Sequence, residues 1–237
     1  MKSLSNKKIA VIGGSAGMGL GIANLAAELG AEVIIGGRTE EKLKSAVEQI
    51  GNGCQGFQID TSDEASVEAF FQRCGKLDHL ATPGSSIRTG PFLETSLENL
   101  QFSINNKYVG QALCAKHALL EEGGSIVFFS GILAQRPRTS SLLGSINAAI
   151  ECLAKGLAVE LAPIRVNAVS PGLTQGTDAF LSMDEAARDA MFEAVKEKLP
   201  TGSVGSPDDM AHAAIFLMTS PFVTGHVLCV DGGGLVI

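Results

Sequence analysis

Aromatic and basic residues are scarce in this sequence. Tryptophan is absent, tyrosine occurs once, and 18 Lys and Arg residues stand against 25 Asp and Glu residues, which gives a formal net charge of -7. Binding of a nucleic-acid backbone needs clustered Lys and Arg to neutralise its phosphates, and the sequence contains no such cluster. We therefore expect no nucleic acid among the partners of this protein.

Long apolar runs and paired cysteine or histidine spacings are also missing. No run reaches the roughly 18 apolar residues of a membrane span, and the polar residues 1–8 lack the apolar core of a signal peptide. The five cysteines lie far apart, which fits free thiols in a reducing compartment. The histidines show no metal-ligand spacing: His79, His117, His212 and His226. We therefore expect a cytoplasmic protein with no metal ion and no membrane contact.

A regular alternation of short apolar runs and helical patterns is present instead. Hydrophobic residues make up 45% of the 237 positions, enough for a buried sheet. Strands are predicted at 9–12, 33–35, 55–59, around Leu80, 125–129, 165–169 and 227–230, and helices at 19–29, 40–50, after Thr61, 97–120, 140–161 and twice more before the last strand. This order predicts an α/β protein with a doubly wound Rossmann fold, in which one parallel sheet of about seven strands carries helices on both faces. Because no composition break divides the chain, we expect a single dinucleotide-binding domain over residues 1–237.

A glycine-rich turn joins the first predicted strand to the first predicted helix. Gly13, Gly17 and Gly19 follow the spacing Gly-x-x-x-Gly-x-Gly. The first glycine permits a sharp turn, the second lets the backbone approach a pyrophosphate, and the third lets the helix pack closely on the strand. The strand-turn-helix context favours a dinucleotide site over a merely tight turn, and Ser15 and Met18 are expected to belong to that site.

The end of the second predicted strand carries a basic residue where an NAD(H) site carries an acidic one, about 20 residues beyond the glycines. Gly36, Gly37 and Arg38 occupy that place. No carboxylate there would repel a 2′-phosphate, and the Arg38 guanidinium could form charge-assisted hydrogen bonds to it. We therefore expect NADP(H) as the cofactor in preference to NAD(H). The alternative is that Arg38 only caps the strand end or pairs with Glu40 or Glu41.

One segment, residues 170–183, lacks a regular pattern. It follows the predicted strand at 165–169 and is rich in Pro, Gly and Thr. Ligands bind at the carboxyl ends of the strands in open α/β sheets, so this segment is either a mobile lid over the site or an ordinary surface loop.

Four motifs, spread from one end of the chain to the other, carry a resemblance to a known family. They are the glycine turn, the pair Asp60-Thr61, the segment RVNAVSPG at 165–172 and the segment VTGHVLCVDGG at 223–233. Together they resemble the short-chain dehydrogenase/reductase family. The resemblance implies an NADP(H)-dependent oxidoreductase acting on a carbonyl or alcohol, and a homodimer or homotetramer formed through the helices predicted at 97–120 and 140–161. It also implies cofactor contacts from Asp60, Thr61, Gly84, Pro171, Gly172 and Thr174 or Thr177.

Two positions near the expected reaction centre also follow from this resemblance. The family's Asn-Asn-Ala-Gly after the fourth strand is replaced by Ala-Thr-Pro-Gly at 81–84, which keeps only the final glycine. Asn105 resembles the helix asparagine that holds a water-linked proton relay, with the adjacent Asn106 as a second register. Ser130 resembles the substrate-orienting serine, with Gly131 as the competing register. We take Ser130 and Asn105 as the candidate catalytic residues.

The family's catalytic Tyr-x-x-x-Lys motif is replaced in this sequence. The helix that should carry it ends in LAVELAP at 157–163, and counting back from that ending places Leu143 at the Tyr position and Asn147 at the Lys position. In such a pair, four residues apart on one helix face, the Tyr donates a proton and the Lys lowers its pKa. Leu143 cannot donate a proton. Asn147 could hydrogen-bond the nicotinamide ribose but cannot supply the charge.

Three functions remain open from the sequence. The first is an oxidoreductase whose proton comes from Ser130, water or Tyr108, although Tyr108 could instead pack in the core or at a subunit interface. The second is a non-catalytic protein that binds or senses NADP(H). The third is a dehydration or isomerisation with the cofactor as a structural element. The retained glycine turn, Ser130, Asn105 and Pro171-Gly172 loop favour the oxidoreductase, whose small-molecule substrate the sequence does not identify.

Overall fold

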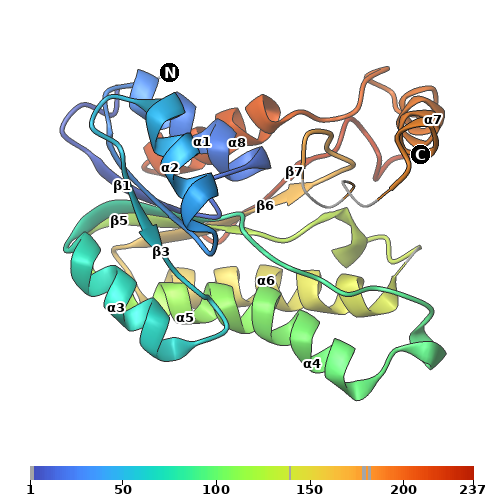
Figure 1. Cartoon of the computed structure of the whole chain (residues 1–237), viewed down its shortest axis with the longest axis horizontal. Helices are drawn as coiled ribbons and strands as arrows, with labels where there is room; N and C mark the ends of the chain where they lie inside the picture. The colour runs from blue at the N-terminus through green and yellow to red at the C-terminus, as the bar shows by residue number, and fades with distance from the viewer. Residues whose placement is uncertain (1–2, 139, 178–179, 181–182) are drawn as a thin grey trace.

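The computed structural model describes residues 3–138, 140–177, 180 and 183–237. Within them seven strands form one parallel sheet in the order β3-β2-β1-β4-β5-β6-β7 (Figure 1). The strands are β1 (Lys8–Ile12), β2 (Glu32–Gly37), β3 (Gln55–Gln58), β4 (Leu77–Thr82), β5 (Leu120–Phe129), β6 (Arg165–Pro171) and β7 (Val227–Val230). The predicted doubly wound α/β fold with a single parallel sheet is therefore confirmed.

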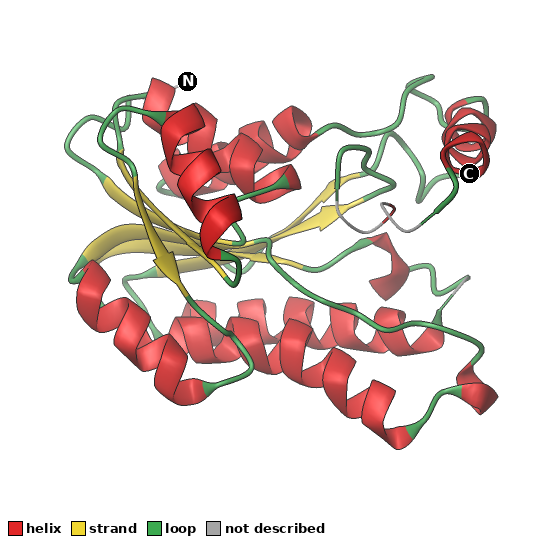
Figure 2. Cartoon of the chain, viewed as in Figure 1, coloured by secondary structure: helices red, strands yellow, loops and turns green. Residues whose placement is uncertain are grey.

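Helices cover both faces of the sheet, as Figures 1 and 2 show. One face carries α1 (Gly17–Glu28), α2 (Glu40–Ile50) and α8 (Pro207–Thr219). The other carries α3 (Glu64–Cys74), α4 (Leu97–Ile104), α5 (Gly110–His117) and α6 (Ser141–Glu160). The helix α7 (Glu185–Lys196) stands at one end of the molecule, and two short 3-10 helices, η1 (Phe92–Glu94) and η3 (Ile132–Ala134), lie in loops.

The helix predicted at 97–120 is divided in the structure. Between α4 and α5 the chain makes a five-residue π-helical turn, η2 (Asn105–Val109). The helix ends at His117 because Ala118 is extended and the chain enters β5 at Leu120. A π-helical turn contains an extra residue, so it changes which side chains of the following helix face the sheet.

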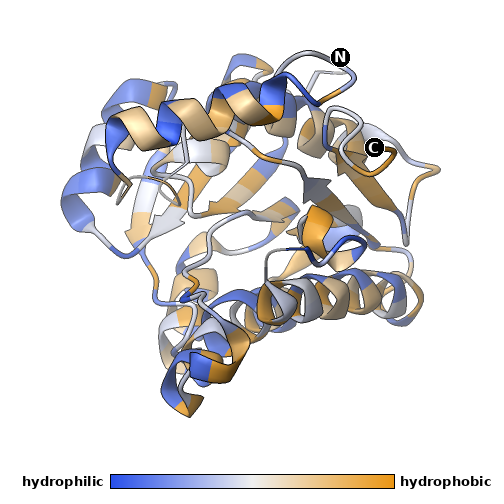
Figure 3. Ribbon diagram, turned by 90° about the vertical axis from the view of Figure 1, so that its right-hand side faces the viewer, coloured by the Kyte–Doolittle hydropathy of each residue, from blue (hydrophilic) through white to orange (hydrophobic). Residues whose placement is uncertain are grey.

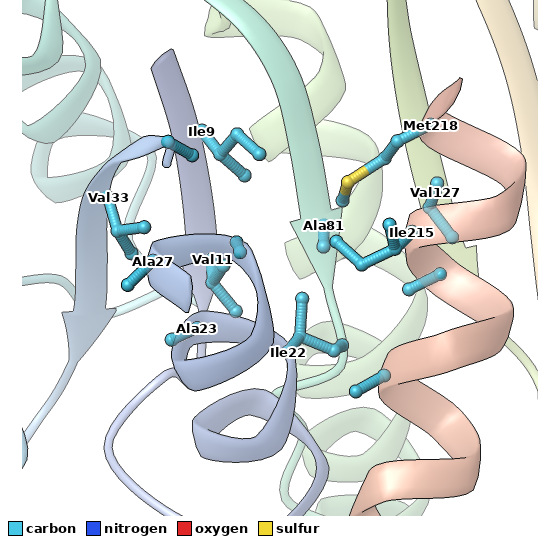
Figure 4. Packing of buried hydrophobic residues seen from close by; sticks show 14 of the residues in the cluster. Ile9, Val11, Ile22, Ala23, Ala27, Val33, Ala81, Val127, Ile215 and Met218 are labelled. Atoms are coloured by element: carbon cyan, nitrogen blue, oxygen red, sulfur yellow. The ribbon is translucent and has the colours of Figure 1, made fainter. Parts of the chain in front are cut away.

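Alternate side chains of β1 enter two separate cores, one on each side of the sheet. Ile9 and Val11 belong to the core that includes α1 and α8, whereas Ala10 and Ile12 belong to the core that includes α3 and α6. Figure 4 shows the first of these cores, in which α1 packs over Val11 and α8 packs beside Ala81 and Val127. Burial on both faces explains why the central strands are unbroken apolar runs in the sequence.

Several helices are amphipathic, α2 most clearly, and Figure 3 shows helices banded orange and blue along their length. Small residues let them approach closely: a Cβ on Gly21 of α1 would lie 2.9 Å from the carbonyl oxygen of Pro207 of α8. Among the described helices, α6 alone is long and apolar enough to cross a membrane. That is weak evidence, because core helices of other proteins pass the same test, and Ile150 and Ala154 of α6 are fully buried.

The chain order of the strands reverses between β1 and β4, and such a reversal opens a crevice at the carboxyl ends of the two strands. Gly13 directly follows β1, and Gly84 follows β4 by two residues. The Gly84 N–H donates to the carbonyl oxygen of Ile12 at 2.9 Å, and a Cβ on Gly84 would lie only 2.8 Å from the Gly13 Cα. Glycine at position 84 therefore lets the two turns pack side by side, and the glycine turn lies where ligands bind.

Candidate active site

A cavity of about 730 Å³ opens at this crevice, within the roughly 300–1,000 Å³ range of small-molecule sites. The glycine-turn residues predicted from the sequence line it together: Gly13, Ser15, Gly17, Met18 and Gly19. A Cβ on Gly19 would overlap the carbonyl oxygen of Gly13. Glycine at this position is therefore what allows α1 to start so close to β1.

The first turn of α1 is suited to an anion. Its N-cap residue, Ala16, makes no side-chain capping bond, and the turn contains no acidic residue. By contrast, the side chains of Asp63 and Ser140 cap α3 and α6. The uncapped N–H groups and the helix dipole favour a negatively charged group such as a pyrophosphate. The absence of a side chain at Gly17 leaves room for such a group. A Cβ at this position would lie 3.4 Å from the Cα of Thr177, which is another residue of the cavity wall.

A basic part of the cavity lies at the carboxyl end of β2 and the start of α2, where Arg38, Thr39 and Lys42 line it. The Arg38 Nη2 donates a hydrogen bond to the Ser86 hydroxyl at 2.8 Å, so the guanidinium reaches from β2 to the loop after β4. The N-cap of α2, Thr39, makes no side-chain capping bond. Two cations beside an uncapped helix start form a suitable place for a phosphate group.

The loop after β4 and the segment after β6 complete the walls of the cavity. From the first come Pro83, Gly84, Ser85, Ser86, Ile87 and Thr89. From the predicted lid or surface loop come Thr177 and Phe180, while residues 178–179 and 181–182 of that segment lie outside the described residues. Thr61 also lines the cavity, and η2 and α5 pack closely on it, because a Cβ on Gly110 would lie 2.8 Å from the Thr61 hydroxyl oxygen.

Some residues predicted to contact the cofactor are not among those that line the cavity: Asp60, Asn147, Pro171, Gly172 and Thr174. Asp60 is exposed, and its carboxylate accepts hydrogen bonds from the hydroxyl and N–H of Ser62 at 2.6 and 2.9 Å. Those bonds, helped by the charge of Arg38, lower the pKa of Asp60. The buried hydroxyl of Thr174 donates to the carbonyl oxygen of Gly172 at 3.2 Å. Cofactor contacts from these five residues stay predictions.

The candidate Asn105 does not reach the cavity. Its side chain is exposed, whereas the next two residues, Asn106 and Lys107, are buried and line the cavity. The π-helical turn of η2 explains the shift, because its wider turn presents a different residue to the sheet than a continuous α-helix would. The assignment of Asn105 is therefore corrected: the helix positions beside the cavity belong to Asn106 and Lys107.

Lys107 is a buried cation of the site. Its Nζ donates to the backbone oxygen of Ser130 at 3.0 Å, and burial lowers its pKa from 10.5 to about 8. Gln111 holds the backbone at this point, because its Nε2 donates to the carbonyl oxygens of Lys107 at 3.1 Å and Phe129 at 3.0 Å. The π-helical turn is thus tied to the carboxyl end of β5.

The side chain of Ser130 points away from the cavity. Its hydroxyl donates to the carboxylate of Glu151, buried on α6, at 3.0 Å, and Ser130 is not among the lining residues. Gly131 instead adjoins Asn147, because a Cβ on Gly131 would lie 2.9 Å from the Asn147 Nδ2. Successive residues at a strand end point to opposite sides. The structure therefore favours the Gly131 register and does not place Ser130 where it could orient a substrate.

The two residues that the sequence predicts at the family's Tyr and Lys positions have different surroundings. Leu143 lines the cavity, whereas Asn147, one turn further along α6, is buried beneath it beside Gly131. The Asn147 Nδ2 donates to the Gly131 oxygen at 3.3 Å, but its Oδ1 has no hydrogen-bond partner among the described residues. A buried acceptor without a partner costs about 1–3 kcal/mol. A buried acceptor of this kind needs a donor from a ligand or from a water molecule.

The remaining candidates lie elsewhere. Tyr108 packs against the core that includes α3 and α6 and does not line the cavity.

Among the described residues, no group of three or more His, Cys, Asp and Glu side chains could hold a metal ion. The charged side chains of the described part of the cavity wall are Arg38, Lys42 and Lys107, all of them basic, so the cavity suits an anionic ligand.

Comparison with known proteins identifies the family. A family model described as enoyl-(acyl carrier protein) reductase matches residues 13–234. The chain is 31% identical to the 3-oxoacyl-[acyl-carrier-protein] reductase of Homo sapiens, over 96% of this chain and 98% of that protein. The chain belongs to the short-chain dehydrogenase/reductase family.

Two solved structures of similar short-chain dehydrogenase/reductase architecture are complexes with NADPH. One, a small-chain dehydrogenase, has a TM-score of 0.83 and 34% identity, with 100% of both chains covered. The other, a blue fluorescent protein from a metagenomic library, has a TM-score of 0.88 and 25% identity, with 98% of this chain and 99% of that chain covered. The family resemblance expected from the sequence is confirmed.

Two basic residues that line the cavity of this short-chain dehydrogenase/reductase were not predicted from its sequence. Lys42 had one usable signal, since it lies four residues after Arg38 and could share a phosphate with it. Lys107 had none, because a lysine within a long polar-and-apolar helix is normally solvated. Only the π-helical turn and the packing on β5 show that Lys107 is buried.

Proposed function

We propose that this protein is an NADP(H)-dependent oxidoreductase that interconverts a carbonyl and an alcohol, with an altered active site. One observation carries the proposal: a single cavity joins Arg38 and Lys42, the glycine turn, and Lys107 with Leu143. A phosphorylated dinucleotide needs a basic place for its 2′-phosphate, a helix N-terminus for its pyrophosphate, and a reaction centre beyond them. The cavity offers these three in that order along the edge of the sheet.

The residues present fit the cofactor. Arg38 and Lys42 would hold the 2′-phosphate, and the first turn of α1 would hold the pyrophosphate at Gly17, where a side chain would crowd the space. The unpartnered Oδ1 of Asn147 could accept a hydrogen bond from a ribose hydroxyl. When bound, the reduced nicotinamide supplies a hydride, and the protein orients the reactants and moves the proton. The NADPH in two similar solved structures supports this choice of cofactor.

Calorimetric titration of the purified protein with NADPH and with NADH tests the cofactor. We expect NADPH to bind at least about tenfold more tightly, because the 2′-phosphate adds charge-assisted hydrogen bonds. Equal affinities would contradict the preference for NADP(H). A protein that bound neither nucleotide would contradict the proposed function altogether.

One observation favours a second function, a non-catalytic protein that binds or senses NADP(H). Leu143, the residue that the sequence predicts at the family's tyrosine position, lines the cavity and cannot donate a proton. Stopped-flow measurement of NADPH oxidation with a panel of ketones separates the two functions. The panel should include acetoacetyl-coenzyme A, a 3-oxoacyl thioester, because the human relative is named for reduction of such a group. Oxidation with alcohol formation supports the oxidoreductase, whereas binding without oxidation supports the sensor.

We also propose a cytoplasmic homodimer or homotetramer that needs neither nucleic acid nor membrane. The outer side of α6 supports the assembly, because Ala148, Cys152 and Gly156 are small and exposed and would let a helix of a second subunit approach closely. Light scattering tests it: a mass of two or four protomers is expected, and a mass of one protomer would contradict the assembly.

A further inference from the structure

We propose that Lys107 is the catalytic acid that delivers a proton to the carbonyl oxygen of the substrate, in place of the absent tyrosine-lysine pair. This proposal rests on the proposed oxidoreductase function. Lys107 belongs to the π-helical turn between α4 and α5, whereas Leu143 belongs to the start of α6. Both side chains line the same cavity, so an ammonium group borders the space that the tyrosine hydroxyl would have served.

The position of Lys107 is set by a rigid network. Gln111, one turn further along, accepts hydrogen bonds from the Thr82 hydroxyl at 2.8 Å and the Phe129 N–H at 2.9 Å. Its amide nitrogen donates to the carbonyl oxygens of Lys107 and Phe129. These bonds join η2 to the ends of β4 and β5. A proton donor has to be held within hydrogen-bond reach of the reacting atom, and this network holds the backbone from which Lys107 projects.

Most of the hydrogen-bonding capacity of Lys107 is unused. An ammonium group has three N–H donors, and the carbonyl oxygen of Ser130 accepts one of them at 3.0 Å. In the part of the chain that the structure describes, Nζ has no other hydrogen-bond acceptor and no carboxylate at ion-pair distance. Donors therefore remain for a ligand oxygen in the cavity.

The charged groups near Lys107 leave it free to release its proton. Directly after β5, the backbone oxygen of Ser130 accepts its hydrogen bond, and the Ser130 hydroxyl is bonded to Glu151 of α6. The other charged residues of the cavity wall, Arg38 and Lys42, lie at the β2 and α2 end. Burial lowers the pKa of Lys107 to about 8. An acid with a pKa near the working pH both gives up and regains its proton readily.

The step balances. The substrate carbonyl carbon receives the hydride supplied by NADPH, which is oxidised to NADP⁺, and the π electrons of the C=O bond move onto oxygen. The Lys107 ammonium gives one proton to that oxygen, so the carbonyl becomes an alcohol. The neutral Lys107 amine then takes a proton from solvent. Reduction needs protonated Lys107, so its rate should fall as pH rises through about 8, and alcohol oxidation should show the opposite dependence.

Three variants of the full-length protein test the role. Lys107→Met removes the ammonium group, and with it the proton, while keeping the length of the aliphatic stem. Lys107→Arg keeps a cation that does not deprotonate in the pH range of the experiment. Lys116→Met is the control, because Lys116 is an exposed lysine on α5 paired with Glu64. Each is titrated with NADPH and then mixed with NADPH and acetoacetyl-coenzyme A or another ketone of the panel. We expect Lys107→Met to bind NADPH within about threefold of wild type and to lose about 10²–10⁴-fold in the single-turnover rate.

A direct chemical measurement accompanies the rates. Trace acetylation with acetic anhydride, across pH values from about 6 to about 11, labels each lysine in proportion to its neutral fraction, and mass spectrometry of peptides reads the labelling of Lys107. We expect a midpoint for Lys107 near the lowered pKa of about 8, well below the roughly 10.4 of an ordinary lysine side chain. NADPH should protect Lys107 from the reagent. In Lys107→Arg, the fall of the reduction rate near that pH should disappear.

The possible failures are distinguishable. Wild-type protein that bound no NADPH would refute the proposed function, and the proton donor with it. Wild-type protein that bound NADPH but reduced no ketone would refute the oxidoreductase function in favour of the sensor, and the proton-donor role with it. The proton-donor role alone would be overturned if Lys107→Met reduced a ketone within about threefold of the wild-type rate, or if acetylation of Lys107 followed that of Lys116.

Discussion

The guanidinium of Arg38 donates a hydrogen bond to the hydroxyl of Ser86 at 2.8 Å, across the gap between the end of β2 and the loop after β4. The contact holds the cation at the edge of the cavity, where it would meet a 2′-phosphate. Arg38→Ala should weaken NADPH binding about 10- to 100-fold, because charge-assisted hydrogen bonds contribute about 1.5–3 kcal/mol. NADH binding should be unchanged. Ser86→Ala should have a smaller effect, and equal losses for both nucleotides in Arg38→Ala would mean that the residue does not contact the 2′-phosphate.

Gly17 is expected to be the glycine at which a single methyl group most directly blocks the cofactor. Its φ is 51°, and a Cβ would lie 3.3 Å from the carbonyl oxygen of Gly176 at the cavity wall. Gly17→Ala should therefore lower NADPH affinity by at least about tenfold, as well as straining the backbone by about 1 kcal/mol. Gly53→Ala is the matched control, because Gly53 has a φ of 74° and open space around its Cβ. It should lose stability but keep NADPH affinity in calorimetry.

Asn147 offers a test that separates binding from stability. Leu has a similar volume, and Asn147→Leu removes both a long hydrogen bond to Gly131 and an acceptor without a partner. Urea denaturation should show a change of no more than about 1 kcal/mol, because the two losses offset each other. NADPH affinity should fall about tenfold if the Oδ1 accepts a hydrogen bond from the cofactor. Unchanged affinity in a stable variant would show that the orphaned oxygen does not mark the cofactor site.

His79 should make the stability of the protein depend on pH. It is buried on β4 and its Nδ1 bonds the Ser125 hydroxyl at 2.9 Å, and burial lowers its pKa from 6.5 to about 4. Between those values the unfolded chain binds the proton and the native protein does not, so stability is full above about pH 6.5 and falls as pH drops to about 4. Urea denaturation should show a loss of about 3 kcal/mol across that window. His79→Asn should reduce this slope, whereas His212→Asn, which removes an exposed histidine of α8, should keep it.

The fold and the glycine-turn end of the cavity could be predicted because their signals are local. Apolar runs become the buried strands of a parallel sheet wherever they lie, and the glycines of the first turn are needed by the turn itself. Gly13, Gly17, Gly19 and Arg38 were accordingly found in the cavity wall where they were expected.

The side chains near the expected reaction centre were harder to predict from the sequence, because a shift of one residue changes which side chain faces the cavity. In the helix, the π-helical turn places Lys107 in the cavity wall and leaves Asn105 at the surface, although the sequence pattern of a continuous helix could not reveal that turn. At the end of β5, successive residues point to opposite sides. Ser130 therefore bonds Glu151, and Gly131 takes the place beside Asn147.

The sequence by itself determined the class of fold and the family, because these depend on pattern and spacing along the chain. Only the tertiary structure decided which side chains meet in the cavity. Lys107 is the clearest case: its burial, its bond to Ser130 and its lowered pKa all arise from packing against the carboxyl end of β5, where Ser130 is 23 residues away in the chain. A side chain acquires such properties from the neighbours that folding brings into contact with it, and those neighbours are distant from it in the sequence.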